Sequence, residues 1–371
     1  MLERLFLSNF KAFDDLELPL GDLTLLSGLN GSGKSSLLQA LGLLRQSYDA
    51  GSLRTGEIGL NGPLVEIGTG RDALYQNFRE RTIGIGLAVS GPSGPVLLDW
   101  SADVPSEADV LICQQRPDQL ASTPINLFSR GFQFLRADRI TPSVTFPKSQ
   151  HAVGQERFLG AHGEYTAYFL LKFGQELTVA PVLRHAEQAN ATSLLAQVNA
   201  WMQELSPGVR VEPEAVPMTD FVRLAYTYRG EKAAYGDPLR PTNVGFGLTH
   251  VLPVVTACLA AEPRTLIVIE NPEAQLHPRG QATLGRLLAL TASNDVQVIV
   301  ETHSDHILNG IRLVAKAGDL DPERTKLHFF SREPGQATTY ETPSLGGDGR
   351  LSFWPIGFFD QWERSLDQLL S

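Results

Sequence analysis

The stretch that most constrains this chain is the glycine-rich run at residues 28–35, Gly-Leu-Asn-Gly-Ser-Gly-Lys-Ser. It matches G-x-x-x-x-G-K-[ST], the pattern of a phosphate-binding loop. An apolar run at 23–26 precedes it and predicts a buried strand, and leucines at three- and four-residue spacing follow it over 37–44. Strand, glycine loop and helix in this order predict a fold that binds phosphate at the helix N-terminus.

The residue types in this loop suit phosphate chemistry. The glycines allow a tight turn, so that backbone N–H groups converge on phosphate oxygens. We expect Lys34 to contact the β- and γ-phosphates of a nucleotide and Ser35 to bind Mg²⁺. The expected nucleotide-binding residues of the loop are Asn30, Gly31, Ser32, Gly33, Lys34, Ser35 and Ser36.

Length and composition restrict the class of protein. The 371 residues are enough for two lobes or domains, and 42% apolar with 19% charged residues is ordinary for a soluble protein. A formal net charge of −10 argues against a protein that coats nucleic acid, although a local basic patch is compatible with it. Cys113 and Cys258 stand in no metal-binding spacing, which favours buried thiols in a reducing compartment.

The N-terminus and the apolar runs bear on location. Residues 1–8 lead directly into a strand pattern without the features of a signal peptide. No run is apolar over the length of a membrane span. We therefore expect a cytoplasmic protein without a membrane segment.

Beyond the phosphate loop, the patterns predict an antiparallel β-subdomain and a helical lobe. Alternating apolar residues at 82–89 and 96–100, joined by a Gly/Pro-rich turn, predict a hairpin. Residues 102–125 contain prolines and acids and are expected to form an exposed loop. A helix is expected at 191–205, with a stripe that suggests core packing rather than a cofactor site: Leu194, Val198, Trp201, Met202 and Leu205.

Two arginines follow a strand predicted at 132–135. Arg136 and Arg139 stand at the strand end, where cationic side chains could contact phosphate or DNA. They could equally form ion pairs with Asp138 and neighbouring acids. The sequence leaves both interpretations open.

Two further apolar strands end in polar residues. The run at 266–269 leads to Glu270, and the run at 296–300 leads to Glu301-Thr302-His303. In a parallel sheet, ligands bind at the carboxyl ends of the strands. We therefore expect Glu270 to hold the water shell of Mg²⁺, and His303 to hydrogen-bond a γ-phosphate or position water. A lone histidine is more often structural, but a strand end favours function.

The segment 243–250, Asn-Val-Gly-Phe-Gly-Leu-Thr-His, precedes an apolar helix predicted at 251–261. Gly245 and Gly247 stand before a helix, as the glycines of the first loop do, and a helix N-terminus of this kind can bind an anion. One nucleotide needs only one such loop. The second therefore suggests a site completed elsewhere, for example by another copy of the chain.

These motifs together resemble those of ATP-binding-cassette (ABC)-type head domains, and most closely the predicted bacterial AAA-family ATPases related to the overcoming-lysogenization-defect (OLD) proteins. The resemblance covers nearly the whole chain. It implies an α/β P-loop NTPase fold, an ABC-type ATPase head with a mixed central sheet, an antiparallel β-subdomain and a helical lobe. Residues 243–250 resemble a divergent signature motif, Glu270 stands at the Walker B position, His303 at the switch-histidine position, and 274–278 resemble the D-loop. The tail at 351–360 resembles a C-terminal domain of unknown function.

The resemblance also implies a division of the chain and an assembly. The parts would be the N-terminal half of the head at 1–150, a helical and β lobe at 151–242, the signature, Walker B and switch-histidine half at 243–318, and a C-terminal hairpin and tail at 319–371. A homodimer or higher homo-oligomer would sandwich ATP, with Gly245 and Gly247 of one subunit capping the nucleotide of the other.

Asn271 departs from the family pattern, which often has a catalytic glutamate at this position. An amide cannot accept a proton from the attacking water, and loss of such a base often costs ~10²–10⁴ in rate. Glu273 and Glu301 are the candidates to replace it. For the Q-loop glutamine, the first candidate is Gln133, ahead of Gln114 and Gln115.

Three hypotheses about function follow. The first is a switch closed by ATP and opened by hydrolysis, which controls a partner such as a nuclease in antiviral defence or DNA metabolism. The second, motivated by Asn271, is an ATP-binding scaffold with little hydrolysis. The third, a DNA-repair-type clamp, is weakened by the acidic charge and by the lack of heptad runs for coiled-coil arms. The segment after His303 has no paired-carboxylate strand pattern, so we expect no nuclease domain in this chain.

Overall fold

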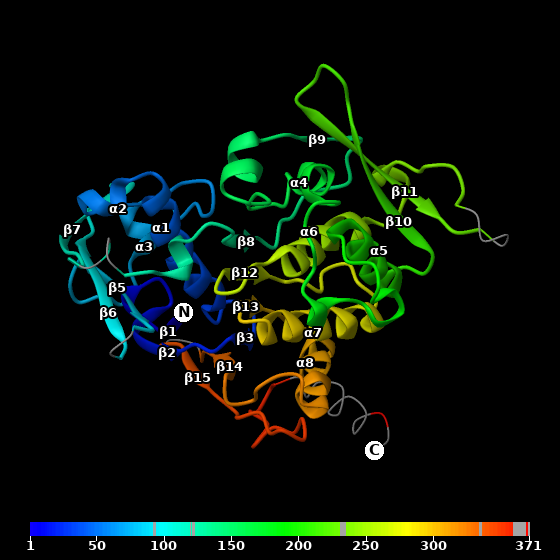
Figure 1. Cartoon of the computed structure of the whole chain (residues 1–371). Helices are drawn as coiled ribbons and strands as arrows, with labels where there is room; N and C mark the ends of the chain where they lie inside the picture. The colour runs from blue at the N-terminus through cyan, green and yellow to red at the C-terminus, as the bar shows by residue number, and fades with distance from the viewer. Residues whose placement is uncertain are drawn as a thin grey trace. The chain divides into compact units, whose positions relative to one another are not determined.

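The computed structural model describes residues 1–91, 94–118, 120, 123–230, 235–333, 336–358 and 369 (Figure 1). The chain divides into two compact units. The first comprises Met1–Ser129, Pro322–Gly346 and Arg350–Ser371, and the second comprises Arg130–Asp321 and Gly347–Gly349. In the described part of the chain, no helix is long and apolar enough to cross a membrane. The four-part division expected from the sequence stays a prediction.

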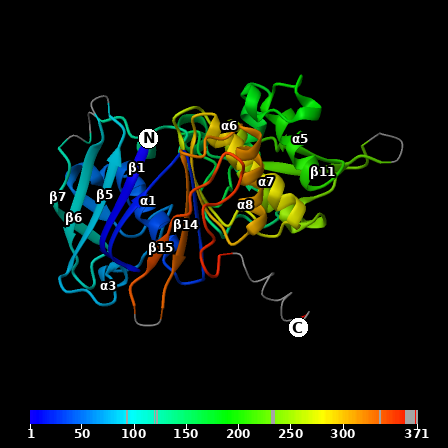
Figure 2. The same ribbon diagram turned by 90° about the horizontal axis from the view of Figure 1, so that it is seen from below.

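An antiparallel sheet with the strand order β2-β1-β5-β6-β7-β4 belongs to the first unit. Apolar side chains on alternate residues of β1 and β5, such as Leu5 and Ile85, are buried on one face. Figure 2 shows β1, β5 and β6 side by side. The strands are β1 (Leu2–Phe10), β2 (Phe13–Pro19), β4 (Glu57–Gly59), β5 (Thr82–Val89), β6 (Val96–Asp103) and β7 (Val110–Gln115).

The predicted hairpin is confirmed, because β5 and β6 pair antiparallel from Thr82↔Asp103 to Val89↔Val96. Pro92 and Ser93 of its turn lie outside the described residues. The prediction of an exposed loop over 102–125 is wrong: β7 lies within it and pairs with β4. This strand is short, and its outward residue Ile112 is 70% exposed, so its sequence lacks the alternation of a half-buried strand.

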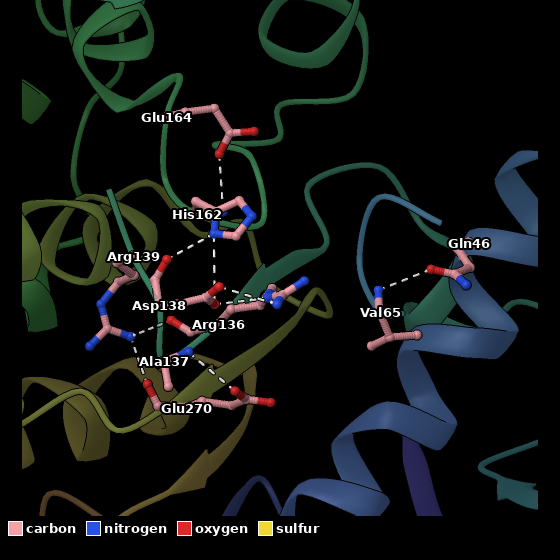
Figure 3. A network of polar contacts seen from close by, with 9 residues as sticks. All are labelled: Gln46, Val65, Arg136, Ala137, Asp138, Arg139, His162, Glu164 and Glu270. Atoms are coloured by element: carbon pink, nitrogen blue, oxygen red, sulfur yellow. Dashed lines mark hydrogen bonds and ion pairs between the residues drawn. The ribbon is translucent and has the colours of Figure 1, made fainter. Parts of the chain in front are cut away.

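The phosphate-loop segment also belongs to the first unit. Strand β3 (Leu23–Gly28) is buried throughout and pairs in parallel with β14 (Thr325–Ser331), which pairs antiparallel with β15 (Thr339–Glu341). Helix α1 (Lys34–Asp49) follows the loop and buries its leucine face. Gln46 on α1 accepts a hydrogen bond from the Val65 N–H (Figure 3). Shorter helices are α2 (Ser52–Thr55), α3 (Gly70–Ala73) and a 3₁₀ turn at Asn126–Phe128.

Parallel strands form the centre of the second unit. Strand β12 (Leu266–Glu270) pairs with β13 (Gln297–Glu301) on one side and with β8 (Gln133–Leu135) on the other. Strands buried on both faces read as continuous apolar runs, which explains the patterns at 266–269 and 296–300. The helices of this part are α6 (Phe246–Ala260), α7 (Pro278–Ser293) and α8 (Asp305–Ala317).

A smaller β-sheet and two helices complete the second unit. Strands β9 (Thr145–Pro147), β10 (Val209–Ala215) and β11 (Phe221–Tyr228) pair in the order β10-β11-β9, and β10 and β11 form a long hairpin (Figure 1). Helix α5 (Leu194–Leu205) buries the predicted stripe from Leu194 to Met202, which confirms its packing role. The other elements are α4 (Thr166–Phe173), a π-helical turn at Gln150–Gln155 and 3₁₀ turns at Pro181–Leu183, Ala186–Gln188 and Pro241–Asn243.

The predicted tail motif at 351–360 lies in the first unit as far as it is described. Phe358 is buried and packs edge-on against Phe329 of β14, with ring centroids 5.3 Å apart. Phe359 and Asp360 lie outside the described residues.

His328 on β14 is a fully buried histidine of the first unit. Its Nε2 donates to the carbonyl oxygen of Pro19 at 2.8 Å, which leaves Nδ1 to accept from the Thr342 hydroxyl at 2.8 Å. Burial lowers the pKa of His328 to about 4, because the imidazolium would lose its hydration. The folded chain therefore keeps this ring neutral.

We expect the free energy of unfolding to fall as the pH drops from about 6.5 towards about 4. In this range the unfolded chain binds a proton at His328 and the folded chain does not, so up to about 3 kcal/mol is lost. Urea unfolding at about pH 7 and about pH 5 measures the change. His328→Gln should reduce this pH dependence, and His151→Gln, which alters an exposed ring, should not. Equal pH dependence in wild type and His328→Gln would contradict the assignment.

Candidate functional site

The phosphate loop of the first unit spans the turn from β3 to α1. Gly33 is the N-cap of α1 and has a left-handed φ of 92°. A Cβ on Gly33 would lie 2.7 Å from the Cβ of Ala12, so both conformation and space require glycine here. The exposed loop residues include Asn30, Gly31 and Ser35, and the buried ones include Ser32, Lys34 and Ser36.

The ammonium group of Lys34 is buried within the loop. Its Nζ donates to the carbonyl oxygens of Gly28 at 3.0 Å and Leu29 at 2.9 Å. A Cβ on Gly31 would meet none of the described atoms within 4 Å, so the outer side of the loop is open. A buried cation beside a helix N-terminus with an open outer side fits an anionic phosphate.

Glu270 ends β12 in the second unit, beside the 136–139 segment (Figure 3). Its Oε2 accepts a hydrogen bond from the Ala137 N–H at 3.1 Å. Burial raises the pKa of Glu270 to about 7, and the negative charge of Glu301 adds to the rise against the Ala137 hydrogen bond. Arg136 offsets only part of this rise, so a bound cation would stabilise the carboxylate further, and Glu270 fits a ligand of Mg²⁺.

Arg139 is buried and donates to backbone carbonyl groups of three segments, and Figure 3 shows its bonds to Arg136 and Glu270. Its Nε donates to His250 at 3.0 Å, one terminal nitrogen to Arg136 at 2.9 Å and Glu270 at 2.6 Å, and the other to Asn271 at 2.6 Å. Burial lowers the pKa of Arg139 to about 10, which leaves the guanidinium charged at neutral pH. This one side chain therefore joins the ends of β8 and β12 to helix α6.

The two arginines that the sequence left open have different partners. Arg136 forms an ion pair with Asp138, one of the two alternatives, with Nε 2.9 Å from Oδ1. Arg139 instead binds backbone carbonyl groups. Because every residue carries a carbonyl group, the sequence does not indicate which residues such an arginine will contact. The one indication of its role was its position shortly after β8, the strand that pairs with β12.

The turn after Glu270 contains Asn271 and Glu273 and contacts His303. Asn271 has a left-handed φ of 42°, which asparagine tolerates better than most residues, and its N–H donates to the Glu301 carbonyl at 2.8 Å. Glu273 Oε1 accepts from the His303 N–H at 2.7 Å. Asn271 Oδ1 and Glu273 Oε2 are buried and find no hydrogen-bond partner within the described ranges.

Gly245 and Gly247 lie at the start of α6, which begins at Phe246 rather than at the predicted residue 251. A Cβ on Gly247 would lie 2.4 Å from the Gln275 carbonyl oxygen, so this glycine lets α6 approach the 271–278 loop. A Cβ on the N-cap Gly245 would meet no described atom within 4 Å. The first glycine therefore leaves the helix N-terminus open, and the second serves packing.

The structure accounts for the candidate Q-loop glutamines differently. Gln133 is buried, donates to the Arg157 carbonyl at 2.6 Å and accepts from the Leu159 N–H at 3.1 Å. Both ends of the Gln133 amide are therefore hydrogen-bonded to the backbone of the second unit, which indicates a structural role. Gln114 donates to Asp103, and Gln115 lines an open polar cleft of the first unit.

The predicted site residues thus form two groups. The loop residues from Asn30 to Ser36 come together in the first unit. In the second unit, hydrogen bonds connect Glu270, Asn271 and His303 through their turns, and Arg139 connects them to α6, which carries Gly247. Their roles towards a nucleotide stay predictions.

Arg139→Met should destabilise the fold, because it leaves buried carbonyl groups without donors. We expect a loss of about 2–4 kcal/mol in the free energy of unfolding, measured by urea denaturation. Arg136→Met removes a partly exposed ion pair and should cost less than about 1 kcal/mol. Equal losses in the two variants would show that the carbonyl contacts of Arg139 do not stabilise the chain.

Three family models match the chain. One described as "AAA domain, putative AbiEii toxin, Type IV TA system" matches residues 123–309, just over half of the 371 residues. An AAA ATPase domain matches residues 1–70, which include the phosphate loop. A protein family of unknown function, DUF3696, matches residues 320–369.

Similar proteins and structures agree with these matches. An OLD nuclease of Thermus scotoductus is 48% identical over 44 residues, which are 12% of this chain and 8% of that protein. The structure of an Smc head bound to the C-winged helix domain of ScpA has a TM-score of 0.52 at 14% identity, over 93% of this chain and 98% of that one. An Smc head with an extended coiled coil, bound to the C-terminal domain of ScpA from Pyrococcus furiosus, has a TM-score of 0.54 at 13% identity, over 100% and 99% of the two chains.

The structural matches confirm the predicted fold class. At this identity they show the fold alone: a mixed α/β ATPase head with parallel strands, an antiparallel sheet and helices. The predicted family is confirmed as well, since a family model covers more than half of the sequence. The chain belongs to the AAA-domain ATPase family.

Proposed function

We propose that this chain is an ATP-driven switch that closes on a second copy of itself when ATP binds and reopens on hydrolysis. The observation that carries this proposal is the phosphate loop, in which the buried Lys34 ammonium lies beside a glycine-capped helix N-terminus. It is supported by the match of this loop to an AAA ATPase domain and of the Glu270 half to an AAA domain.

Each site residue has a role in this proposal. Lys34 and the N–H groups of residues 30–36 bind the phosphates, and His303 hydrogen-bonds the γ-phosphate. Ser35 and Glu270 hold Mg²⁺, which when bound neutralises charge on the phosphates during hydrolysis. The raised pKa of Glu270 supports this role, because a metal would add positive charge to that of Arg136 and favour the ionised carboxylate.

The partner is proposed to be a separate protein, such as a nuclease in antiviral defence or DNA metabolism. The OLD nuclease relative and the Smc heads bound to ScpA domains support control of a partner by a head of this kind. The match spans only 8% of the OLD nuclease. Nuclease activity is therefore proposed for a partner protein and not for this chain.

A second candidate function is a scaffold that binds ATP and hydrolyses little of it. Asn271 favours it, since its amide cannot accept a proton. Steady-state hydrolysis by the purified chain, with Lys34→Ala as the blank, separates the two functions. Turnover above the blank supports the switch, and ATP binding without turnover supports the scaffold.

Lys34→Ala should abolish ATP binding. Loss of the ammonium removes charge-assisted hydrogen bonds to two phosphates, which we expect to raise the Kd at least about 100-fold in equilibrium binding of labelled ATP. Lys316→Ala on α8 alters an exposed lysine and serves as the control. Retained ATP affinity in Lys34→Ala would overturn the assignment of the loop.

Gly245→Ala should leave folding unchanged but weaken ATP-dependent dimerisation. The added methyl group would meet no described atom of its own chain. In the proposed dimer it would stand where the phosphate of the nucleotide bound by the second copy approaches α6. Light scattering with a non-hydrolysable ATP analogue should show a roughly tenfold weaker dimer. Gly247→Ala instead should lower the unfolding temperature, because its Cβ would collide with the Gln275 carbonyl. A wild-type dimer in Gly245→Ala would count against the signature role.

A further inference from the structure

The proposed hydrolysis needs a group that accepts a proton from the attacking water. Asn271 cannot do this, because an amide is not a base at neutral pH. The carboxylates that the structure places at the ends of β12 and β13 are Glu270, Glu273 and Glu301. One of these is therefore the first place to look for the base.

Glu270 and Glu301 are the less suitable candidates, because both lie at the strand ends where Mg²⁺ is proposed to bind. Glu270 accepts the Ala137 N–H, and it is the proposed Mg²⁺ ligand, whose lone pairs the metal would take. Glu301 is 5% exposed and stands in register with Glu270 on the neighbouring strand, so it lies beside the proposed Mg²⁺ ligand. Glu273 lies beyond the strand, in the turn that follows it.

The carboxylate of Glu273 has one oxygen held by a hydrogen bond and the other without a donor. Oε1 accepts the His303 N–H at 2.7 Å, which orients the group. Oε2 is buried and has no hydrogen-bond partner among the residues that the structure describes. The buried Arg139 guanidinium interacts electrostatically with Glu273 ahead of Glu270, so an anion here has a positive neighbour.

The side chain of Asn271 supplies a second acceptor in the same turn. The Ala274 N–H closes this turn by donating to the backbone carbonyl of Asn271 at 3.2 Å. Its Oδ1 is also buried, and no described residue donates to it. A buried acceptor that stays unpaired loses the hydrogen bonds that it makes to water in the unfolded chain. A water molecule has two O–H donors and is a common partner of buried acceptors that the protein leaves without one.

We infer that Glu273 is the general base of this ATPase and that Asn271 orients the attacking water, an inference that rests on the proposed function. The water oxygen forms a bond to the γ-phosphorus, and the bond from that phosphorus to the β–γ bridging oxygen breaks. ADP leaves with the electron pair of the broken bond. One water proton passes to Glu273 Oε2 and from there to solvent, so ATP and water give ADP, phosphate and a proton.

Glu273→Gln is the variant that tests this inference. The glutamine oxygen can still accept the His303 N–H, but the amide cannot take a proton. Turnover should fall ~10²–10⁴-fold, while the Kd for ATP should stay within about threefold of wild type. The ATP-stabilised dimer should therefore persist longer in size-exclusion chromatography. Asp138→Asn, which neutralises an exposed carboxylate paired with Arg136, should keep wild-type turnover.

Adding Asn271→Asp to Glu273→Gln gives a rescue test. The aspartate places a carboxylate where Asn271 stands, and aspartate tolerates the left-handed φ of 42° there. We expect part of the lost turnover to return. No recovery, with ATP binding intact, would count against a missing base as the cause.

The outcomes separate this inference from the proposed function. Wild-type turnover in Glu273→Gln would overturn the base and leave the switch standing. Loss of ATP binding in Glu273→Gln would make Glu273 a structural residue and also overturn it. If the wild-type chain bound ATP without turnover above Lys34→Ala, both the base and the switch would be overturned in favour of the scaffold.

Discussion

The buried guanidinium of Arg139 holds together the part of the second unit where the chemistry is proposed to occur. Where a strand ends, its carbonyl groups lose their ladder partners, and a buried carbonyl without a donor is costly. The planar fork of an arginine offers five N–H donors, enough for the carbonyl groups of Arg136, Glu270, Asn271 and His250 together. The placement of the Glu270 carboxylate and of the turn after it therefore depends on this one side chain.

Several polar groups in this region lack a full set of partners among the described residues. Glu270 is half-buried, and its loss of hydration outweighs the charge of Arg136 and raises its pKa to about 7. Asn271 and Glu273 each carry a buried oxygen without a donor in the described chain. Gln133, by contrast, has both ends of its buried amide hydrogen-bonded to backbone. A buried polar group without a partner in the protein calls for an explanation such as a bound water or ion, whereas the hydrogen bonds of Gln133 explain its place in the fold.

Glycines with the same sequence signal serve different purposes in this chain. Gly33 is required by its left-handed φ of 92° and by the neighbouring Ala12. Gly247 is required because the Gln275 carbonyl lies against it, and Gly245 has open space instead. A motif shows that glycine occurs, whereas only the surrounding atoms show whether backbone shape, packing or an approaching ligand needs it.

By itself, the sequence determined the features that are local. The phosphate loop between a buried strand and a helix, the β5–β6 hairpin, the stripe of α5 and the parallel strands ending in Glu270 and Glu301 all follow from motifs or periods contained within a few turns of chain. Tertiary structure alone decided strand β7, the separate roles of Arg136 and Arg139, and the contact between Glu273 and the His303 N–H. Arg139 and Asn271 are separated by 132 positions, and a hydrogen bond to a carbonyl group places no demand on the identity of the residue that carries it. Such contacts depend on which distant segments the fold brings together, and a single sequence does not record this.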